Sequence, residues 1–326
     1  MLCIKHQSTD PYFNIATDEY IFKHIDEDCF MLWRNDNAII VGKHQNTLAE
    51  INYDYVKEKD IKIVRRLSGG GAVYHDLGNL NFTFTRKGEN YEMIDFKRYT
   101  KPIIAVLKKL GIDAKFEGRN DLTISGKKFS GNAEHVFRNK VLHHGTLLFS
   151  SEMKDISGAL KINPLKYKDK ATKSVPNRVT NISDHLEKKI TVDEFTDKVM
   201  DYVINNFENA KLYEFTEEDI KKIQQIRDEK YATWEWNYGY FPDYDFKQKT
   251  KTEGGIVEIN MNVSDGKIKD IRITGDFFHI KDISPVEKAL VNTKHQEEEI
   301  RKALGQFNLK NYFEKVTEDD LISLLF

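Results

Sequence analysis

The chain contains little cysteine and little proline. Its 326 residues include two cysteines, Cys3 and Cys29, too few for a disulfide framework or a zinc site with four cysteine ligands. It has 6 prolines and no tract rich in serine and glycine, so long flexible linkers are not expected. The low cysteine content favours a reducing compartment, and we expect the protein to be cytoplasmic.

Long apolar runs are also missing. No stretch of about 18 apolar residues occurs, so we expect no membrane-spanning helix and no membrane partner. The first residues, Met1–Gln7, lack the basic, apolar and small-residue series of a secretory signal peptide.

No excess of one charge is present. The 50 lysines and arginines nearly balance the 52 aspartates and glutamates, and the formal net charge is −2. Proteins that bind nucleic acid through bulk charge are strongly basic, so we expect no nucleic-acid partner. A local basic pocket for a single nucleotide is still compatible with this balance.

The chain does contain the material for a hydrophobic core. Hydrophobic residues make up 40%, aromatic residues 12% and charged residues 31% of the sequence, as in globular proteins and unlike disordered ones. At about 150 residues per domain, the length predicts about two domains.

Patterns along the first 250 residues mix helices with neighbouring strands. Capping boxes at Thr191 and Thr216 predict two helix starts, and Thr100 and Gly111 are expected to begin and end a third helix. Strands are expected at 30–33, 38–41, 61–64, 79–85, 122–124, 128–130 and 141–149, and further helices at 12–25 and 53–59. Strands follow strands more often than helices, which predicts an α+β fold with a mixed or antiparallel sheet flanked by helices.

The pattern changes after Lys251. Apolar and polar residues alternate from 257 to 263, a turn follows at 264–266, and the alternation returns at 271–273, which predicts a hairpin. Helices are expected after it. We therefore predict a small α+β domain at 252–326, a larger domain at 1–245, and a polar linker at Tyr244–Glu253.

The densest chemical signal is the run Arg65–Asp76, Arg-Arg-Leu-Ser-Gly-Gly-Gly-Ala-Val-Tyr-His-Asp. Successive glycines let the backbone approach a ligand, their amides can hold an anion, and paired arginines bind carboxylate or phosphate. The alternative is a tight turn with solvated arginines, which three glycines beside two arginines make less favourable. The run has neither the Gly-Lys-Ser/Thr ending of a Walker loop nor a Gly-x-Gly-x-x-Gly pattern.

A second candidate segment runs from Gly118 to Ala133. Lys128 stands among small residues, so its ammonium group can reach a bound anion, and Asp121 with Asn120 offers hard oxygens for magnesium on a phosphate. The alternative is an exposed hairpin whose lysines are solvated on an edge strand. Taken alone, the segment favours that alternative.

Two other stretches carry charged or ionisable residues. Neighbouring strand residues point to opposite faces, so His143 and His144 are not expected to share one metal, and His144 is expected to be hydrogen-bonded at the core or a pocket. The stretch Lys173–Ile182 either closes over a nucleotide or caps the next helix. A hydrolase triad is not favoured at His75-Asp76, because no Gly-x-Ser-x-Gly elbow or nearby cysteine accompanies it.

Taken together, these stretches resemble the lipoate–protein ligase family. The similarity extends in order over residues 1–250, and residues 251–326 correspond to the family's small C-terminal accessory domain. The similar stretches are Leu32–Asn35, Val41–Asn46, Arg65–Asn79, Asn120-Asp121, Lys128–Ala133, His143–Leu148 and Ser174–Asn181.

The resemblance implies the biotin/lipoate ligase fold and a two-step reaction. ATP and (R)-lipoate, with Mg²⁺, are expected to give lipoyl-AMP and pyrophosphate. The lipoyl group is then expected to pass to a lysine of a lipoyl domain, in an E2 subunit of a 2-oxoacid dehydrogenase or in the glycine cleavage H protein. The contact with this acceptor is expected to be transient, and the enzyme to be a monomer.

The resemblance also assigns roles to residues. Lys128 is expected to be catalytic, and Asp121 with Asn120 to support magnesium. The residues expected to bind ATP or lipoyl-AMP are Arg66, Gly70, Gly71, Ala72, Val73, Tyr74, Asn79, Lys128, Ser130, Gly131, Ala133 and Arg178. Those expected to line the lipoate pocket are Arg66, Ser68, Gly69, His75, Phe82, His144 and Gly145, with Phe84 and Tyr74 as further walls.

Three other kinds of protein are alternatives to the ligase. Octanoyl- and lipoyl-transferases of this fold use a cysteine, but no cysteine follows Cys29, so only a cysteine-independent transferase stays open. Biotin ligases fit less well, because their sequences do not share the glycine-rich run and no helix-turn-helix precedes it. A non-catalytic binder of lipoyl domains need not keep both Lys128 and Asp121.

Overall fold

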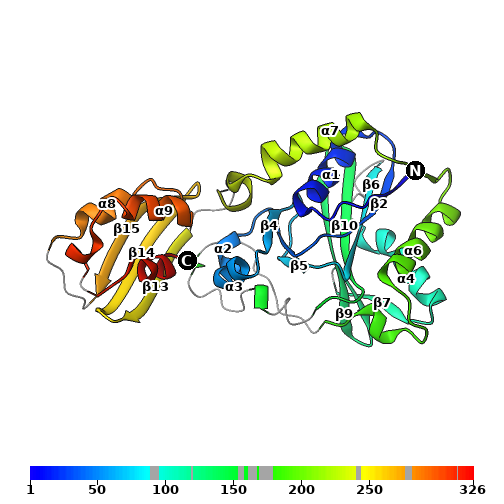
Figure 1. Ribbon diagram of the computed structural model, residues 1–326. Coiled ribbons are helices and arrows are strands. Elements are labelled where there is room, and N and C mark those ends of the chain that lie inside the picture. The colour runs from blue at the N-terminus through cyan, green and yellow to red at the C-terminus, as the bar shows by residue number, and fades with distance from the viewer. Residues whose placement is uncertain are drawn as a thin grey trace. The chain divides into compact units, whose positions relative to one another are not determined.

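The computed structural model describes residues 1–88, 95–118, 120–152, 158–160, 167–168, 179–239, 244–275, 281–313 and 315–326 (Figure 1). The chain divides into two compact units. The first comprises Met1–Lys43, Asp54–Leu160 and Ser174–Thr233, and the second comprises His44–Tyr53, Lys161–Lys173 and Trp234–Phe326. The expected boundaries at 1–245 and 252–326 stay a prediction. No helix among the described residues is long and apolar enough to cross a membrane.

The first unit is built on an eight-stranded sheet with the order β12-β1-β2-β6-β10-β9-β8-β7. β1 pairs in parallel with β2 and β12, and the other neighbours pair antiparallel, which confirms the predicted mixed sheet of an α+β fold. The strands are β1 (Leu2–Lys5), β2 (Cys29–Trp33), β6 (Asn79–Lys87), β7 (Ala114–Glu117), β8 (Asp121–Ile124), β9 (Lys127–Phe137), β10 (Lys140–Leu148) and β12 (Lys211–Leu212).

A three-stranded sheet in the same unit carries the glycine-rich run. Its central strand β3 (Ala38–Val41) is parallel to β4 (Lys62–Arg65) and antiparallel to β5 (Val73–His75). The chain therefore leaves β4 at Arg65, passes through the glycines and returns along β5. Helix α3 (Tyr53–Glu58) precedes β4.

One face of the eight-stranded sheet is apolar and covered by α4 (Phe96–Lys109) and α6 (Val192–Asn206). Alternate residues of the strands point to this face, and apolar residues at helical spacing meet them. Burial of these side chains forms the main core. Its members include Phe30, Leu32, Leu80, Phe82, Phe84, Ile103, Val106, Phe195 and Val199.

The other face of the sheet is covered by α1 (Pro11–His24). This helix has Asp10 as its N-cap, and η3 (Arg227–Tyr231), which follows α7 (Glu217–Ile226), packs against it. Glu19 of α1 accepts hydrogen bonds from Lys230 Nζ at 2.6 Å and from the Tyr231 hydroxyl at 2.5 Å. These bonds hold α1, which supplies polar residues to the site described below.

Helix α4 begins one turn earlier than predicted. Asp95 is its N-cap and accepts from the backbone N–H of Arg98, whereas Thr100 lies inside the helix and donates to the carbonyl of Phe96 at 2.7 Å. A threonine hydroxyl can bond to the carbonyl four residues back, so a threonine in front of an apolar run does not by itself mark a helix start. The predicted end is confirmed, because Gly111 follows the helix with φ +82°.

The second unit contains a sheet with the order β11-β13-β14-β15. The predicted linker is wrong, because its residues form β13, which pairs antiparallel with β14 and buries Phe246. The predicted hairpin is confirmed, and Asp265 and Gly266 form its turn with φ 51° and 67°. The elements are β11 (Tyr167–Lys168), β13 (Tyr244–Thr252), β14 (Gly255–Ser264), β15 (Lys267–Gly275), α2 (Thr47–Glu50), η4 (Glu235–Gly239), α8 (Ser284–Leu290), α9 (Glu297–Leu304), η5 (Leu309–Asn311) and α10 (Glu318–Leu325).

Candidate active site

The face of the eight-stranded sheet under α1 is buried but polar. On β6, Asn79, Asn81 and Thr83 alternate with the core residues and are almost completely buried. Thr83 pairs with His144 of β10, and Asn81 pairs with Thr146. Burial of polar groups is unfavourable unless they are hydrogen-bonded, so a whole polar face inside a protein indicates a binding site.

A chain of hydrogen bonds joins this face to the glycine-rich run. The Ser68 hydroxyl lies 2.5 Å from His144 Nε2, and His144 Nδ1 lies 2.8 Å from Asp18 Oδ2 on α1. Asp18 Oδ1 accepts from the Thr83 hydroxyl at 2.7 Å, and Thr83 accepts from Trp33 Nε1 at 2.9 Å. With the carboxylate accepting at Nδ1, His144 carries its proton there, and Nε2 accepts from Ser68.

Arg66 holds the glycine-rich loop in place through hydrogen bonds. Its guanidinium donates to the Ser68 hydroxyl and to the carbonyls of Ile40, Gly69 and Gly71, at 2.6–3.0 Å. Burial lowers the pKa of Arg66 to about 10. Since C=O and N–H point in opposite directions across a trans peptide, the N–H groups that follow Gly69 and Gly71 point away from the cation. Arg66 thereby fixes the directions of the Gly69 and Gly71 carbonyls in the loop.

The loop also depends on a close backbone contact. A Cβ atom on Gly42, just after β3, would lie 2.0 Å from the carbonyl oxygen of Gly70. Gly70 itself has φ +93°, a conformation that glycine adopts without strain. Glycine is therefore required at Gly42 for the loop to pack against β3.

His75 is the last residue of β5 and lies among the buried polar side chains of this face, which we call the polar cluster. Its Nδ1 lies 3.1 Å from Asn35 Nδ2, and Asn35 Oδ1 accepts from Asn14 of α1. Burial lowers the pKa of His75 to about 3, so the ring is neutral. Because Asn35 donates to Nδ1, the proton sits on Nε2, which is buried and has no partner among the described residues.

Lys128 reaches the polar face through a β-bulge. Thr123 of β8 pairs with Lys128, but Leu122 pairs with Ser130, so Phe129 is an extra residue in β9. The bulge sends Phe129 into the core and places the Lys128 ammonium over Gly131, 3.0 Å from where a Cβ would lie.

A carboxylate and a further segment fix this lysine. Lys128 Nζ lies 2.8 Å from Asp121 Oδ1, and both side chains are about one-quarter exposed. The Lys128 carbonyl accepts from the N–H of Thr180, and Val179 forms a β-bridge with Lys128. Arg178 itself lies outside the described residues, next in the chain to this bridge.

Asn120, expected to assist the metal, forms hydrogen bonds to the backbone and side chain of Asn132. Its Nδ2 donates to the carbonyl of Asn132 at 2.5 Å, and its own carbonyl accepts from the backbone N–H and the side-chain amide of Asn132, both at 3.0 Å. Ser130 is buried and accepts from Asn132 Nδ2 at 3.2 Å. Asn120 therefore fixes the position of Asp121 in this structure.

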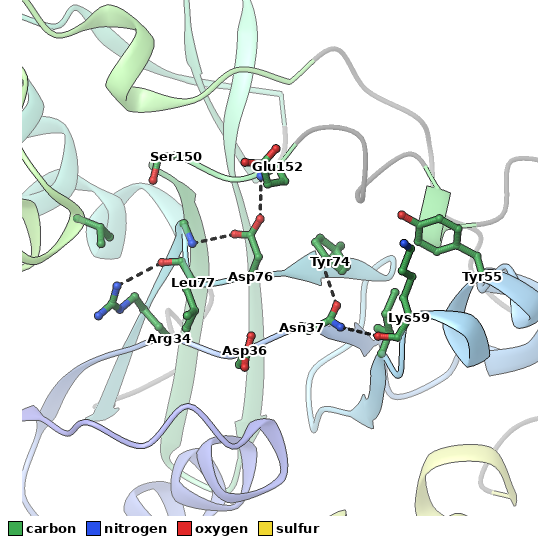
Figure 2. A pocket seen from close by; sticks show the side chains of 13 residues that line it. Arg34, Asp36, Asn37, Tyr55, Lys59, Tyr74, Asp76, Leu77, Ser150 and Glu152 are labelled. Carbon is green, nitrogen blue, oxygen red and sulfur yellow. Dashed lines mark hydrogen bonds between the residues drawn. The ribbon is translucent and has the colours of Figure 1, made fainter.

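A separate pocket of about 630 Å³ lies beside β5 (Figure 2). Tyr74 points into it and donates to Asn37 Oδ1 at 3.0 Å, whereas its neighbour His75 belongs to the polar cluster. The pocket is lined by Arg34, Asp36, Asn37, Tyr55, Lys59, Ile61, Tyr74, Asp76, Leu77, Gly78, Ser150, Glu152 and Val192. Of the described residues expected to bind ATP, only Tyr74 lines this pocket.

Phe82 and Gly145 do not lie on the polar face. Phe82 belongs to the core under α4, and a Cβ on Gly145 would lie 2.6 Å from its ring. Strand alternation places both side-chain directions opposite to that of His144. The structure therefore differs from the prediction that they line a pocket together with Ser68 and His144. Phe84, suggested as a further wall, also lies in this core.

Sequence reasoning missed several residues of the polar cluster. These residues are Asn14 and Asp18 of α1, Trp33 at the end of β2, Asn35 after it, and Thr83 of β6. Two signals were available: a polar triplet, Thr17-Asp18-Glu19, within an otherwise apolar helix, and strictly alternating Asn and Thr residues along β6.

Comparisons with known proteins identify the family and the fold. The family "Lipoyl protein ligase A/B catalytic domain" matches residues 10–204, and "Bacterial lipoate protein ligase C-terminus" matches residues 241–325. The chain is 40% identical over 331 residues to the lipoate–protein ligase LplJ of Bacillus subtilis, covering 100% of both chains.

Solved structures show the same fold. Protein Ta0514 of Thermoplasma acidophilum with bound lipoic acid has a TM-score of 0.64 at 25% identity, over 73% of this chain and 99% of that chain. A bipartite lipoate protein ligase of that organism, described with its E2 lipoyl domain, has a TM-score of 0.63 at 26% identity over 73% and 96%. A lipoate-protein ligase A bound with ATP also has 0.63, at 25% identity over 73% and 98%.

The matches to both family models and the shared fold define a ligase of the lipoyl class. The chain belongs to the lipoate–protein ligase family. The predicted enzymatic activity, that of a lipoate–protein ligase, is confirmed.

Proposed function

We propose that Lys128 is the catalytic cation with which this ligase joins lipoate to AMP. In the first step a lipoate carboxylate oxygen attacks the α-phosphorus of ATP, and the bond to the β-phosphate breaks with loss of pyrophosphate. In the second step the amine of an acceptor lysine attacks the carbonyl carbon of lipoyl-AMP. The bond to AMP breaks, an amide forms, and the amine loses a proton.

The observation that carries this proposal is the position of Lys128. The bulge in β9 directs its ammonium group over Gly131, on the face that also holds His144. Negative charge grows on the α-phosphate oxygens during the first step. A fixed cation there acts where the transition state needs it, and such a contact contributes about 3–4 kcal/mol.

The residues near Lys128 fit a magnesium ion only when phosphates complete its shell. Among the described residues, no three or more His, Cys, Asp or Glu side chains gather to hold a metal. Mg²⁺ is commonly held by one or two carboxylates together with substrate phosphates, and Asp121 supplies one carboxylate here. Asp121 would hold the ion, which would neutralise phosphate charge. The amide nitrogen of Asn120 is already used in holding Asn132.

Two buried atoms support binding of the lipoyl adenylate on the polar face. His75 Nε2 and Asn79 Oδ1 have no hydrogen-bond partner in the part of the chain that the structure describes. Leaving such groups unpaired costs about 1–3 kcal/mol each, so a ligand that pairs with them gains that energy. We assign them to the ligand, together with Ser68, the glycine-loop amides and, by its place next to the Val179 bridge, Arg178.

The acceptor proposed is a lipoyl domain of a 2-oxoacid dehydrogenase E2 subunit or the glycine cleavage H protein. The support is the relative described with its E2 lipoyl domain. Such a contact needs to be transient, because each acceptor must leave after modification. We propose that the enzyme acts as a monomer.

A direct test combines the protein with lipoate, magnesium-ATP and a purified lipoyl domain. Mass spectrometry is expected to show AMP and an acceptor heavier by one lipoyl group on a lysine. An acceptor that stays unmodified, with no AMP released, would contradict the proposed reaction. Omitting ATP is the control that shows whether modification depends on activation of lipoate by ATP.

A further inference from the structure

A buried histidine lies behind the proposed catalytic lysine, on the core face of the sheet. His143 Nδ1 lies 2.8 Å from Glu134 Oε1, and His143 Nε2 lies 3.3 Å from Asn132 Oδ1. Both the His143 and Glu134 side chains are almost completely buried, at 0% and 2% exposed. His143 therefore bridges two residues of β9 from the neighbouring strand β10.

Asn132 also forms hydrogen bonds to Asn120, the residue before Asp121. Its side-chain amide donates to the carbonyl of Asn120, and Asn120 donates back to the carbonyl of Asn132. Asn120 is followed by Asp121, which pairs with Lys128. An unbroken series of hydrogen bonds thus runs from Glu134 through His143 to the residue before Asp121.

The hydrogen-bond directions in this series depend on one another. Asn132 Nδ2 donates to Asn120, so Asn132 Oδ1 faces His143 and must accept a proton from Nε2. A neutral ring protonated at Nε2 presents a lone pair at Nδ1. Glu134 must then supply the proton that lies between its Oε1 and Nδ1.

We propose that His143 and Glu134 are positioning residues that hold Asp121 and Lys128 in place through Asn132 and Asn120, and that they do so only while Glu134 is protonated. This inference rests on the proposed role of Lys128. Without that proton, the carboxylate takes a proton from the ring at Nδ1. His143 Nε2 then becomes an acceptor facing another acceptor, so the Asn132 amide must turn and lose its bond to the Asn120 carbonyl. Asn120 is then held only by its two bonds to the backbone of Asn132.

The surroundings of Glu134 favour its protonated form. Burial and the nearby Asp95 carboxylate, at the N-terminus of α4, raise the pKa of Glu134 to about 7. Burial holds the pKa of His143 well below its usual value, so the ring does not compete for a second proton. Tyr99 of α4 also lies beside His143, with the two rings 4.9 Å apart, and burial raises the pKa of Tyr99.

The experiment measures lipoate-dependent exchange of pyrophosphate into ATP for four proteins, from about pH 6 to about pH 9. The variants are His143→Leu, Glu134→Gln and, as a control in the same core, Val141→Ala. Near pH 6.5, His143→Leu is expected to lower the exchange rate constant about 10- to 100-fold, as small misplacements of catalytic groups do. The wild-type rate is expected to fall as the pH rises through about 7. Glu134→Gln cannot lose its proton, so it is expected to keep the wild-type rate below that pH and to lack this fall.

Each result decides the proposal. An unchanged rate in His143→Leu, or a Glu134→Gln profile with the wild-type fall, would overturn it. So would a loss in Val141→Ala as large as in His143→Leu, because a damaged core would then explain both. Lys128→Ala is assayed alongside to separate the two hypotheses. If this variant retains exchange, the proposed role of Lys128 is wrong. If it is inactive while His143→Leu and Glu134→Gln behave like the wild type, only the positioning role is wrong.

Discussion

Lys128 Nζ lies 2.8 Å from Asp121 Oδ1, on a part of the sheet where a bulge in β9 has turned the lysine toward the buried polar face. The pair is partly exposed, so its worth for stability is small, about 0–1 kcal/mol. Its use is chemical: the carboxylate fixes the direction of the ammonium group. A ligand phosphate and a metal ion can then meet both charges.

Replacement of Lys128 tests its catalytic role. Lys128→Ala is expected to fold normally, because the side chain contributes no core packing. Its rate of ATP–pyrophosphate exchange is expected to fall about 10²- to 10³-fold, the loss typical for removing one fixed charge contact in a transition state. The measurement is exchange with saturating lipoate, and circular dichroism checks the fold. A rate near that of the wild type would reject the assignment.

Replacement of Asp121 tests the magnesium site. Asp121→Asn keeps the size of the side chain but removes its charge, so the Mg²⁺ concentration needed for half-maximal exchange is expected to rise. The expected shift is about 10-fold, within the range seen when groups at metal sites are changed. The control is Asp113→Asn, an exposed carboxylate before β7. Identical magnesium titrations for Asp121→Asn and the wild type would count against the site.

Steric contact at Gly42 gives a prediction about folding. Gly42→Ala places a methyl group 2.0 Å from the Gly70 carbonyl, and only a backbone shift can relieve the clash. We expect a loss of about 1–3 kcal/mol in the free energy of unfolding, measured with urea. Gly69→Ala is the matched control, because a Cβ there meets nothing within 4 Å. Equal stability of the two variants would show that the loop packs differently.

The raised pKa of Glu134 predicts a pH dependence of stability. The carboxyl group titrates at about 7 in the folded protein and near its ordinary value of about 4.3 when unfolded. The folded state therefore binds this proton more tightly. The stabilisation is complete below the unfolded pKa and is lost as the pH rises through about 7.

Urea unfolding of the wild type and Glu134→Gln at several pH values checks this sign. The wild type is expected to lose stability relative to the variant between about pH 5 and about pH 8, by a few kcal/mol. A difference between the two proteins that stays constant over this range would contradict the shifted titration. The measurement needs no ligand, so it is independent of the catalytic proposals.

Much of the architecture was readable from local sequence patterns. The capping boxes at Thr191 and Thr216 start α6 and α7 as predicted, since a cap needs only residues three positions apart. The alternation in β6 and in the hairpin of β14 and β15 is likewise local. The lysine-rich stretch that forms β13 shows too little alternation of apolar and polar residues to predict a strand. Its strand structure depends on pairing with β14, which is distant information that the stretch itself does not contain.

Some features of the candidate site follow from the sequence, and others follow only from the tertiary structure. The sequence by itself determined the glycine-rich run, Lys128 and Asp121, because their residue types and order carry the chemistry. Only the tertiary structure brought Asp18 to His144, 126 residues away, and His144 to Ser68, 76 residues away. Only the bulge at Phe129 decided which face Lys128 reaches. Strand order, register and bulges arise from pairing between distant segments, and a one-residue slip exchanges the two faces of a strand, so no local pattern can specify them.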